Sequence, residues 1–246
     1  MSGFSRDRID SRERHLKDIR AAHLALAGPL QVIFIGGKVL ALYAKATGDA
    51  LRPTNDIDGV VPVDFGRYQF ELQKLLAARV LRLPPSEDRE GAPPCRYQLV
   101  DGELNIDLLD LGGHQVGGVN PYLATAVSAC AEYDAGEGVR VRAITPPYFL
   151  LTKLVSLRDP ERTGTEPVQH WDAEDIVSVF VEVDDILSQV EGAGLLNDVQ
   201  REFAETLRVL QVTDVVPFLD LWLRPDVPER HRIVREFRWL ALREPR

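Results

Sequence analysis

The chain has 246 residues, of which 45% are hydrophobic and 27% charged, and its formal net charge is −9. This length is enough for one large domain or two smaller ones. The apolar runs are too short to cross a bilayer, so we expect no membrane span. The negative charge argues against a protein coated for tight, nonspecific binding of nucleic acid.

The chain ends and the cysteines bear on where the protein works. The N-terminal stretch is charged throughout and lacks the apolar segment of a secretory signal, so we expect the cytoplasm. Cys95 and Cys130 are isolated, so neither a disulfide framework nor a structural zinc site is indicated. Residues 224–246 carry seven arginines against four acids, which predicts a local basic surface or, more simply, a solvated helix.

The first 145 residues are predicted to form a mixed α/β unit. Short apolar runs bounded by turn residues indicate strands, and longer runs with one apolar face indicate helices. Residues 83–94 form a loop by composition, and Asp101-Gly102 favours a turn between two strands. We expect helices at 10–27, 38–46 and 65–79, and strands at 31–35, 56–63, 95–100, 104–111 and 139–144.

The rest of the chain is predicted to be helical. Pro146 and Pro147 suit a first helical turn, and apolar residues follow them at helical spacing. We therefore expect an α+β fold with a soft boundary near residue 145, which separates an α/β domain (1–145) from a helical C-terminal domain (146–246). The expected helices cover 146–159, 170–189, 197–210, 214–223 and 228–243, with a loop at 159–169.

Two acids one residue apart form the first candidate site. In a strand, Asp56 and Asp58 share one face while Ile57 fills the other. Their like charges repel, so either both are well solvated, as in a turn begun by the preceding Pro-Thr-Asn, or a divalent cation lies between them.

A third acid and a glycine pair extend this site. Asp107 stands in an otherwise apolar strand, where a carboxylate is costly unless it is paired or binds metal, although a strand with one wet face explains it equally well. Gly36 and Gly37 lie between a strand and a helix, where glycine lets the backbone approach a phosphate; a simple turn is the alternative.

The helical half adds one base and two acids. Lys153 lies on or beside the apolar stripe of its helix, from which it either reaches water or provides a cation for phosphate. Asp172 and Asp175 share one face of the next helix, where acids also favour the helix dipole. We take His170 as structural. No nucleophile elbow or Cys context appears, so the acids are the candidate chemistry.

In this order, the features resemble the AbiEii/MenT-type nucleotidyltransferases of the DNA polymerase β-like nucleotidyltransferase superfamily. The resemblance covers about residues 31–180 and implies a nucleotidyltransferase fold, with a small mixed β-sheet flanked by helices and then a helical C-terminal domain. The family run Arg-x-Thr-x-Asp-hydrophobic-Asp is matched by Arg52, Thr54, Asp56, Ile57 and Asp58, and later family motifs by Lys153, Asp172 and Asp175.

The resemblance implies a two-metal site for Mg²⁺. Asp56, Asp58 and Asp107 would hold the ions while an acceptor hydroxyl attacks the α-phosphate of an NTP. Lys153 would neutralise charge on the phosphates, and Asp175, or alternatively Asp172, would position Lys153 or the nucleotide. Lys38 stands where the family usually has Ser or Thr. The implied NTP-binding residues are Gly36, Gly37, Lys38, Arg52 and Thr54.

The resemblance also implies an acceptor and a partner. The acceptor would be the 3′ end of tRNA, and the protein would be a toxin or abortive-infection effector held in check by a cognate antitoxin. The alternative within the enzyme class is AMPylation-like modification of a protein or a small molecule, which the negative net charge favours. From a different class, a non-catalytic interaction module with the same fold is the second hypothesis, against which the intact acids and Lys153 count.

Overall fold

The computed structural model describes residues 4–27, 30–45, 51–85, 93–100, 104–111, 120–159, 170–223 and 227–242. The chain divides into two compact units. Unit 1 consists of Met1–Leu42 and Pro53–Thr145, and unit 2 of Tyr43–Arg52 and Pro146–Arg246. The chain therefore passes between the units near residue 145 and also on either side of the short segment 43–52, because that segment belongs with the helical part of the chain.

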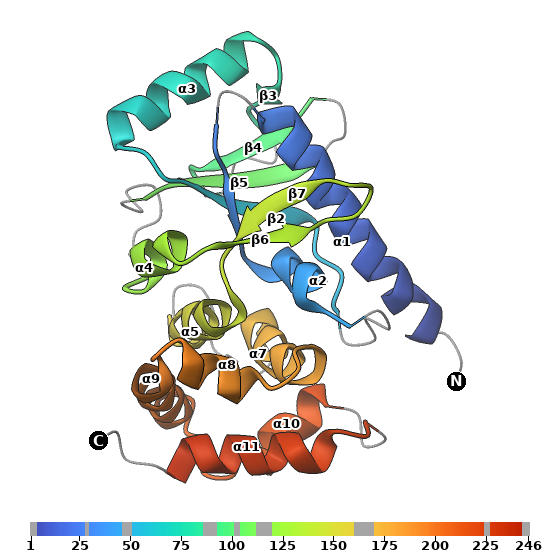
Figure 1. Ribbon diagram of the computed structural model, residues 1–246, viewed down its shortest axis with the longest axis vertical. Coiled ribbons are helices and arrows are strands. Elements are labelled where there is room, and N and C mark those ends of the chain that lie inside the picture. The colour runs from blue at the N-terminus through green and yellow to red at the C-terminus, as the bar shows by residue number, and fades with distance from the viewer. Residues whose placement is uncertain are drawn as a thin grey trace. The chain divides into compact units, whose positions relative to one another are not determined.

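Unit 1 is built on a mixed sheet (Figure 1), in which seven strands of the described chain lie in the order β3-β4-β5-β2-β1-β7-β6. The β2–β5 and β1–β7 pairs are parallel and the other neighbours are antiparallel. The strands are β1 (Ile33–Ile35), β2 (Asp56–Val61), β3 (Leu81–Arg82), β4 (Arg96–Leu99), β5 (Asn105–Asp110), β6 (Ala131–Asp134) and β7 (Arg140–Ala143).

Two long helices hold this sheet in place. In α1 (Phe4–Leu26), four buried side chains recur at helical spacing, namely Leu16, Ile19, Ala22 and Leu26. The helix α3 (Phe65–Ala77) begins at Asp64, whose side chain accepts a hydrogen bond from the Arg67 backbone N–H. The Tyr68 hydroxyl of α3 donates to the Leu108 carbonyl of β5 at 2.8 Å, which fixes α3 against a strand that carries the candidate site.

The remaining helix of the unit and the turn at the glycine pair are short. Gly37–Val39 forms the 3₁₀ turn η1, followed by α2 (Leu40–Tyr43), so the continuous helix predicted for 38–46 is wrong in its length. The elements β3, α4 (Leu123–Ser128) and β6 were not predicted. The strand β6 has alternating half-buried and exposed residues and no apolar run, and its pairing with β7 makes it a strand.

Unit 2 is a helical assembly around a cluster of phenylalanines. The centroid of the Phe237 ring lies 4.7 Å from that of Phe180 and 5.0 Å from that of Phe203, and both pairs pack edge to face. The helix predicted for 170–189 divides in two because Asp185 adopts a left-handed conformation, φ 50°. The helices are α5 (Pro146–Leu157), α7 (Trp171–Glu182), α8 (Ile186–Gly192), α9 (Leu196–Val209), α10 (Val215–Trp222) and α11 (Arg230–Leu242).

The other predicted elements are found within a few residues of their expected bounds, except that α1 begins at Phe4 rather than at residue 10. The Asp101-Gly102 turn and most of the loops predicted at 83–94 and 159–169 lie outside the described residues. Among the helices that the structure describes, none has both the length and the apolar character that a membrane span requires.

Candidate active site

The register of two parallel strands brings the predicted metal-binding acids together in unit 1. Asp58 of β2 is paired with Asp107 of β5, and Asp56 with Asn105 two residues earlier. Because side chains at paired positions point to the same face of a sheet, these four polar residues share one face. Ile57 and Ile106 are paired between them, and both are buried. The alternation expected from the sequence thus places the polar and apolar residues on opposite faces.

An arginine that sequence reasoning missed lies among these acids. Arg96 of β4 is the antiparallel partner of Asp107 and reaches both of its carboxylate oxygens, with Nε to Oδ1 at 2.8 Å and one terminal nitrogen to Oδ2 at 2.7 Å. The same nitrogen donates to Oδ2 of Asp56 at 2.9 Å. These carboxylates and their hydrogen bonds raise the pKa of Arg96 even though burial opposes the charge.

The hydroxyl of Thr54 orients the first acid of the pair. Thr54 Oγ1 donates to Oδ1 of Asp56 at 2.7 Å, the oxygen that Arg96 does not contact. Both oxygens of Asp56 are therefore engaged by neighbours in unit 1. The structure gives Thr54 a direct contact to one of the acids, whereas its predicted contact with the NTP stays a prediction.

Gly36, the first residue of the glycine pair, lies directly against the carboxylate of Asp58. Its backbone has φ 74° and ψ −173°, a region that only glycine adopts readily. A Cβ added at Gly36 would lie 1.9 Å from Oδ2 of Asp58, so the carboxylate of Asp58 occupies the space that any side chain there would need. Gly37 follows as the first residue of η1.

Replacing Gly36 by Ala is expected to destabilise the protein by about 2–3 kcal/mol, because backbone strain adds to the displacement of Asp58. Gly138 provides the matched control: its φ is 76°, yet a Cβ there meets nothing within 4 Å. Gly138→Ala should cost about 1 kcal/mol from strain alone. Urea unfolding of both variants measures the difference, and equal losses would show that Asp58 does not need the space at Gly36.

Lys38 lies in the interior of unit 1. Its side chain is 1% exposed, and its Nζ donates to Oδ2 of Asp18 in α1 at 2.6 Å. Burial lowers the pKa of Lys38, although the hydrogen bond and charge of Asp18 oppose the shift. The structure thus gives its ammonium a partner in α1, whereas contact with a phosphate stays a prediction.

The remaining predicted residues gather in unit 2. The Lys153 ammonium of α5 lies 2.6 Å from Oδ1 of Asp172 and 2.8 Å from Oδ2 of Asp175, both in α7. Arg52 makes two hydrogen bonds to Asp175, from Nε at 3.0 Å and from a terminal nitrogen at 3.2 Å. Burial would lower the pKa of Arg52, but Asp175 raises it above its ordinary value. Two cations and two acids thus form one compact network.

This network is buried, and its ion pairs connect α5 and Arg52 to α7. The side chains of Asp172 and Asp175 are each 1% exposed and that of Lys153 is 6% exposed. His170 caps α7, because its side chain accepts a hydrogen bond from the Asp172 backbone N–H, so its interpretation as structural is confirmed. The guanidinium of Arg52 also lies over the Trp171 ring, 5.5 Å from its centre.

The acids of unit 1 fit Mg²⁺ in their donor chemistry, because Mg²⁺ prefers carboxylate oxygens. Among the described residues, however, no group of three or more His, Cys, Asp or Glu side chains is arranged to hold a metal ion as it stands. Arg96 already compensates the charges of Asp56 and Asp107, so a metal bound there would compete with its guanidinium. Burial, together with the charges of Asp107 and Asp58, raises the pKa of Cys95 to about 12, so this neighbouring thiol carries no charge at neutral pH without metal.

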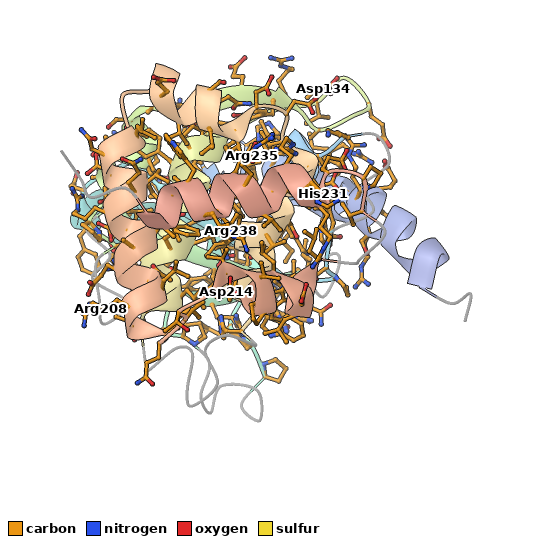
Figure 2. The ribbon with its side chains drawn as sticks, turned by 90° about the horizontal axis from the view of Figure 1, so that it is seen from below. Asp134, Arg208, Asp214, His231, Arg235 and Arg238 are labelled. Atoms are coloured by element: carbon orange, nitrogen blue, oxygen red, sulfur yellow. The ribbon has the colours of Figure 1, made fainter. Side chains whose placement is uncertain are left out.

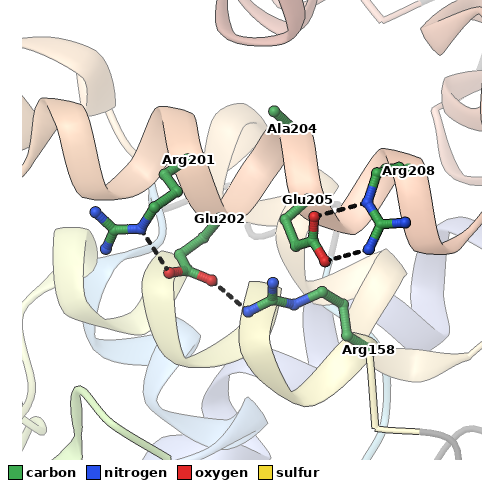
Figure 3. A pocket seen from close by; sticks show the side chains of 6 residues that line it. All are labelled: Arg158, Arg201, Glu202, Ala204, Glu205 and Arg208. Carbon is green, nitrogen blue, oxygen red and sulfur yellow. Dashed lines mark hydrogen bonds and ion pairs between the residues drawn. The ribbon is translucent and has the colours of Figure 1, made fainter. Parts of the chain in front are cut away.

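A shallow pocket in unit 2 contains none of the predicted site residues. Its volume is about 360 Å³, and Figure 3 shows that the charged side chains around it pair with one another. Glu202 is paired with Arg158 and Arg201, and Glu205 with Arg208. Because Arg201 also pairs with Asp198, each of these charges is compensated, and the pocket offers no strong ionic site. Its lining residues are Arg158, Arg201, Glu202, Ala204, Glu205 and Arg208.

Comparison with solved structures identifies the class of fold. The chain is similar to the crystal structure of an antigenic nucleotidyltransferase-like protein from Paracoccidioides brasiliensis, with a TM-score of 0.50 and 17% sequence identity, over 87% of this chain and 94% of that chain. The fold is therefore an α+β, nucleotidyltransferase-like fold, and the predicted fold class is confirmed. No family model matches the sequence, and no curated protein matches it. The AbiEii/MenT subtype stays a prediction.

Proposed function

We propose that the protein is a Mg²⁺-dependent nucleotidyltransferase that moves an NMP from an NTP to an acceptor. The observation that carries this proposal is the register of β2 and β5, which places Asp58 beside Asp107 and Asp56 on the same face of the sheet. Gly36, whose space is taken by Asp58, adds a glycine turn at the same point. Acids on two neighbouring strands beside a glycine turn are what a metal-bound triphosphate requires.

In this proposal, Asp56, Asp58 and Asp107 hold the metal, which when bound stabilises charge on the attacking and leaving oxygens. The oxygen of an acceptor hydroxyl forms the new bond to the α-phosphorus and its proton passes to solvent, while the bond from that phosphorus to the bridging oxygen breaks and that oxygen leaves with pyrophosphate. Thr54 keeps Asp56 oriented through its 2.7 Å hydrogen bond. The backbone at Gly36 and Gly37, free of side chains, lets phosphate oxygens approach.

The ion pairs in unit 2 favour a role in stability for the four residues that make them. Lys153, proposed from the resemblance as the cation for the phosphates, is engaged by Asp172 and Asp175, and Arg52 by Asp175. Asp175 contacts Lys153 as a positioning residue would. The proposed contact between Lys153 and phosphate therefore requires that at least one of its ion pairs be exchanged.

We further propose the 3′ end of tRNA as the acceptor and a toxin or abortive-infection role with a cognate antitoxin. Arg235 and Arg238, two exposed arginines of α11, support a polyanionic acceptor, and His231 is exposed one turn before them (Figure 2). The net charge of −9 favours a protein or small-molecule acceptor instead.

One observation favours the non-catalytic module. Arg96 already compensates Asp56 and Asp107 with three hydrogen bonds, as would be expected if these acids served the fold alone. An interaction module would need the sheet and its charges but no metal.

Labelling separates these candidates. The purified protein is incubated with each α-labelled NTP, Mg²⁺, total RNA and total protein, and the products are separated by size and by nuclease or protease sensitivity. The proposal expects label in the tRNA fraction that is lost when EDTA removes Mg²⁺. Label in protein would replace tRNA as the acceptor and keep the enzyme. A parallel incubation with a small-molecule cell extract, read by pyrophosphate release, reports a small-molecule acceptor. No label and no pyrophosphate release with any NTP would leave the non-catalytic module.

A further inference from the structure

We propose that Arg96 is an internal competitor of the metal, a resident cation that holds two of the acids until Mg²⁺ displaces it. This inference rests on the proposed function, because it assumes that the acids bind metal. In addition, Arg96 would set the affinity of the site for its metal.

The contacts of Arg96 are those that a metal ion would need. Its guanidinium faces both oxygens of Asp107 at 2.8 and 2.7 Å and reaches Asp56 at 2.9 Å. The bridge between Asp56 and Asp107 passes through one terminal nitrogen, so a single group joins acids of β2 and β5. Such a planar, permanently charged fork matches carboxylate geometry better than an ammonium would.

Burial makes these contacts important in the absence of metal. The side chain of Asp107 is 10% exposed and that of Arg96 24% exposed, so solvent compensates the carboxylate only weakly. Asp58 lies beside Asp107 in the sheet, and without a cation the acids would repel one another. Arg96 therefore stabilises the metal-free fold.

The same contacts must oppose metal binding. Mg²⁺ bound to the same carboxylates would be repelled by the guanidinium of Arg96, and the two cations would compete for the negative charge of Asp56 and Asp107. The free energy of the Arg96 contacts is then subtracted from that of metal binding, as for any two ligands that compete for one site. The site should consequently bind free metal weakly and fill when a metal-bound triphosphate supplies further contacts.

Arg96→Gln tests the competition, and two variants accompany it. Arg96→Lys keeps the charge without the fork, so it remains informative if Arg96→Gln fails to fold. Arg82→Gln is the matched control, because Arg82 lies on the same face, where its Nε donates to Gln98 at 3.1 Å and contacts none of the acids. Calorimetric titration with Mg²⁺ and Mn²⁺ alone, without nucleotide, measures affinity, and thermal unfolding with and without metal measures coupling to stability.

We expect Arg96→Gln to bind metal about tenfold or more tightly than the unchanged protein, to unfold at a lower temperature without metal, and to gain more from its addition. Arg96→Lys should lie between the two, and Arg82→Gln should match the unchanged protein. Equal affinity in all four proteins would overturn the competition while leaving the metal site and the proposed function standing. Absence of metal binding in every protein, with or without NTP, would overturn both.

Discussion

Asp58→Asn is expected to reduce nucleotidyl transfer by about a thousandfold. A metal contributes several kcal/mol to the stabilisation of transition-state charge, and about 1.4 kcal/mol corresponds to a factor of ten in rate. Asparagine keeps the shape of the side chain, which lies where a Cβ on Gly36 would be, but removes the negative charge that the metal requires. Label transfer at saturating NTP and Mg²⁺ measures the loss.

The control for this substitution removes an acid from the same sheet without touching the site. Glu132 is an exposed residue of β6, a strand at the far end of the sheet order from β3, and Glu132→Gln should retain full transfer. Unfolding in urea shows whether Asp58→Asn is folded. Transfer within threefold of the unchanged protein by a folded Asp58→Asn would contradict the assignment of Asp58 as a metal ligand.

The grouping of the acids follows from sequence patterns that act at short range. Alternation predicts that Asp56 and Asp58 share a face and that Asp107 lies on the polar face of its own strand. Alternation does not predict which strands pair with each other. That β5 lies beside β2 in parallel, with Asp58 opposite Asp107, depends on contacts between residues nearly 50 positions apart in the chain.

Arg96 was missed for a related reason. The run 95–100 was predicted as a strand and the run 104–111 as the next, with a turn between them, which already implied an antiparallel pair. Counting outward from that turn would have placed Arg96 opposite Asp107, as the register shows. The hairpin pattern thus contains the signal, but an arginine in a strand is usually solvated, so its residue type alone does not mark it as the counter-ion of an acid.

Members of the Arg-x-Thr-x-Asp-x-Asp run make contacts in different parts of the structure. Thr54 hydrogen-bonds to Asp56 within unit 1. Arg52, only two residues earlier, belongs to unit 2 and holds Asp175, which lies 123 residues further along the chain. The resemblance implies NTP binding for both residues, which stays a prediction, and the contacts seen here place Arg52 with unit 2 and Thr54 with unit 1.

The buried ion pairs of unit 2 are expected to contribute strongly to the stability of the protein. Lys153→Met is expected to lower the free energy of unfolding by about 3–5 kcal/mol, because it leaves Asp172 and Asp175 buried with less compensating charge. Arg52 continues to pair with Asp175, so the loss should fall mainly on Asp172, whose partner Lys153 lies at 2.6 Å. Urea unfolding followed by circular dichroism measures it.

Lys45→Met provides the matched control, because it makes the same chemical change at an exposed ion pair of the same unit. Lys45 lies 2.9 Å from Asp184, whose side chain is 79% exposed, and removal of such a pair should cost less than about 1 kcal/mol. A Lys153→Met protein as stable as Lys45→Met would show that Lys153 is not needed to compensate the buried acids. Its ion pairs would then be weak enough to exchange for a phosphate, which is what a catalytic role for Lys153 requires, so the stability measurement also bears on the role that the resemblance implies.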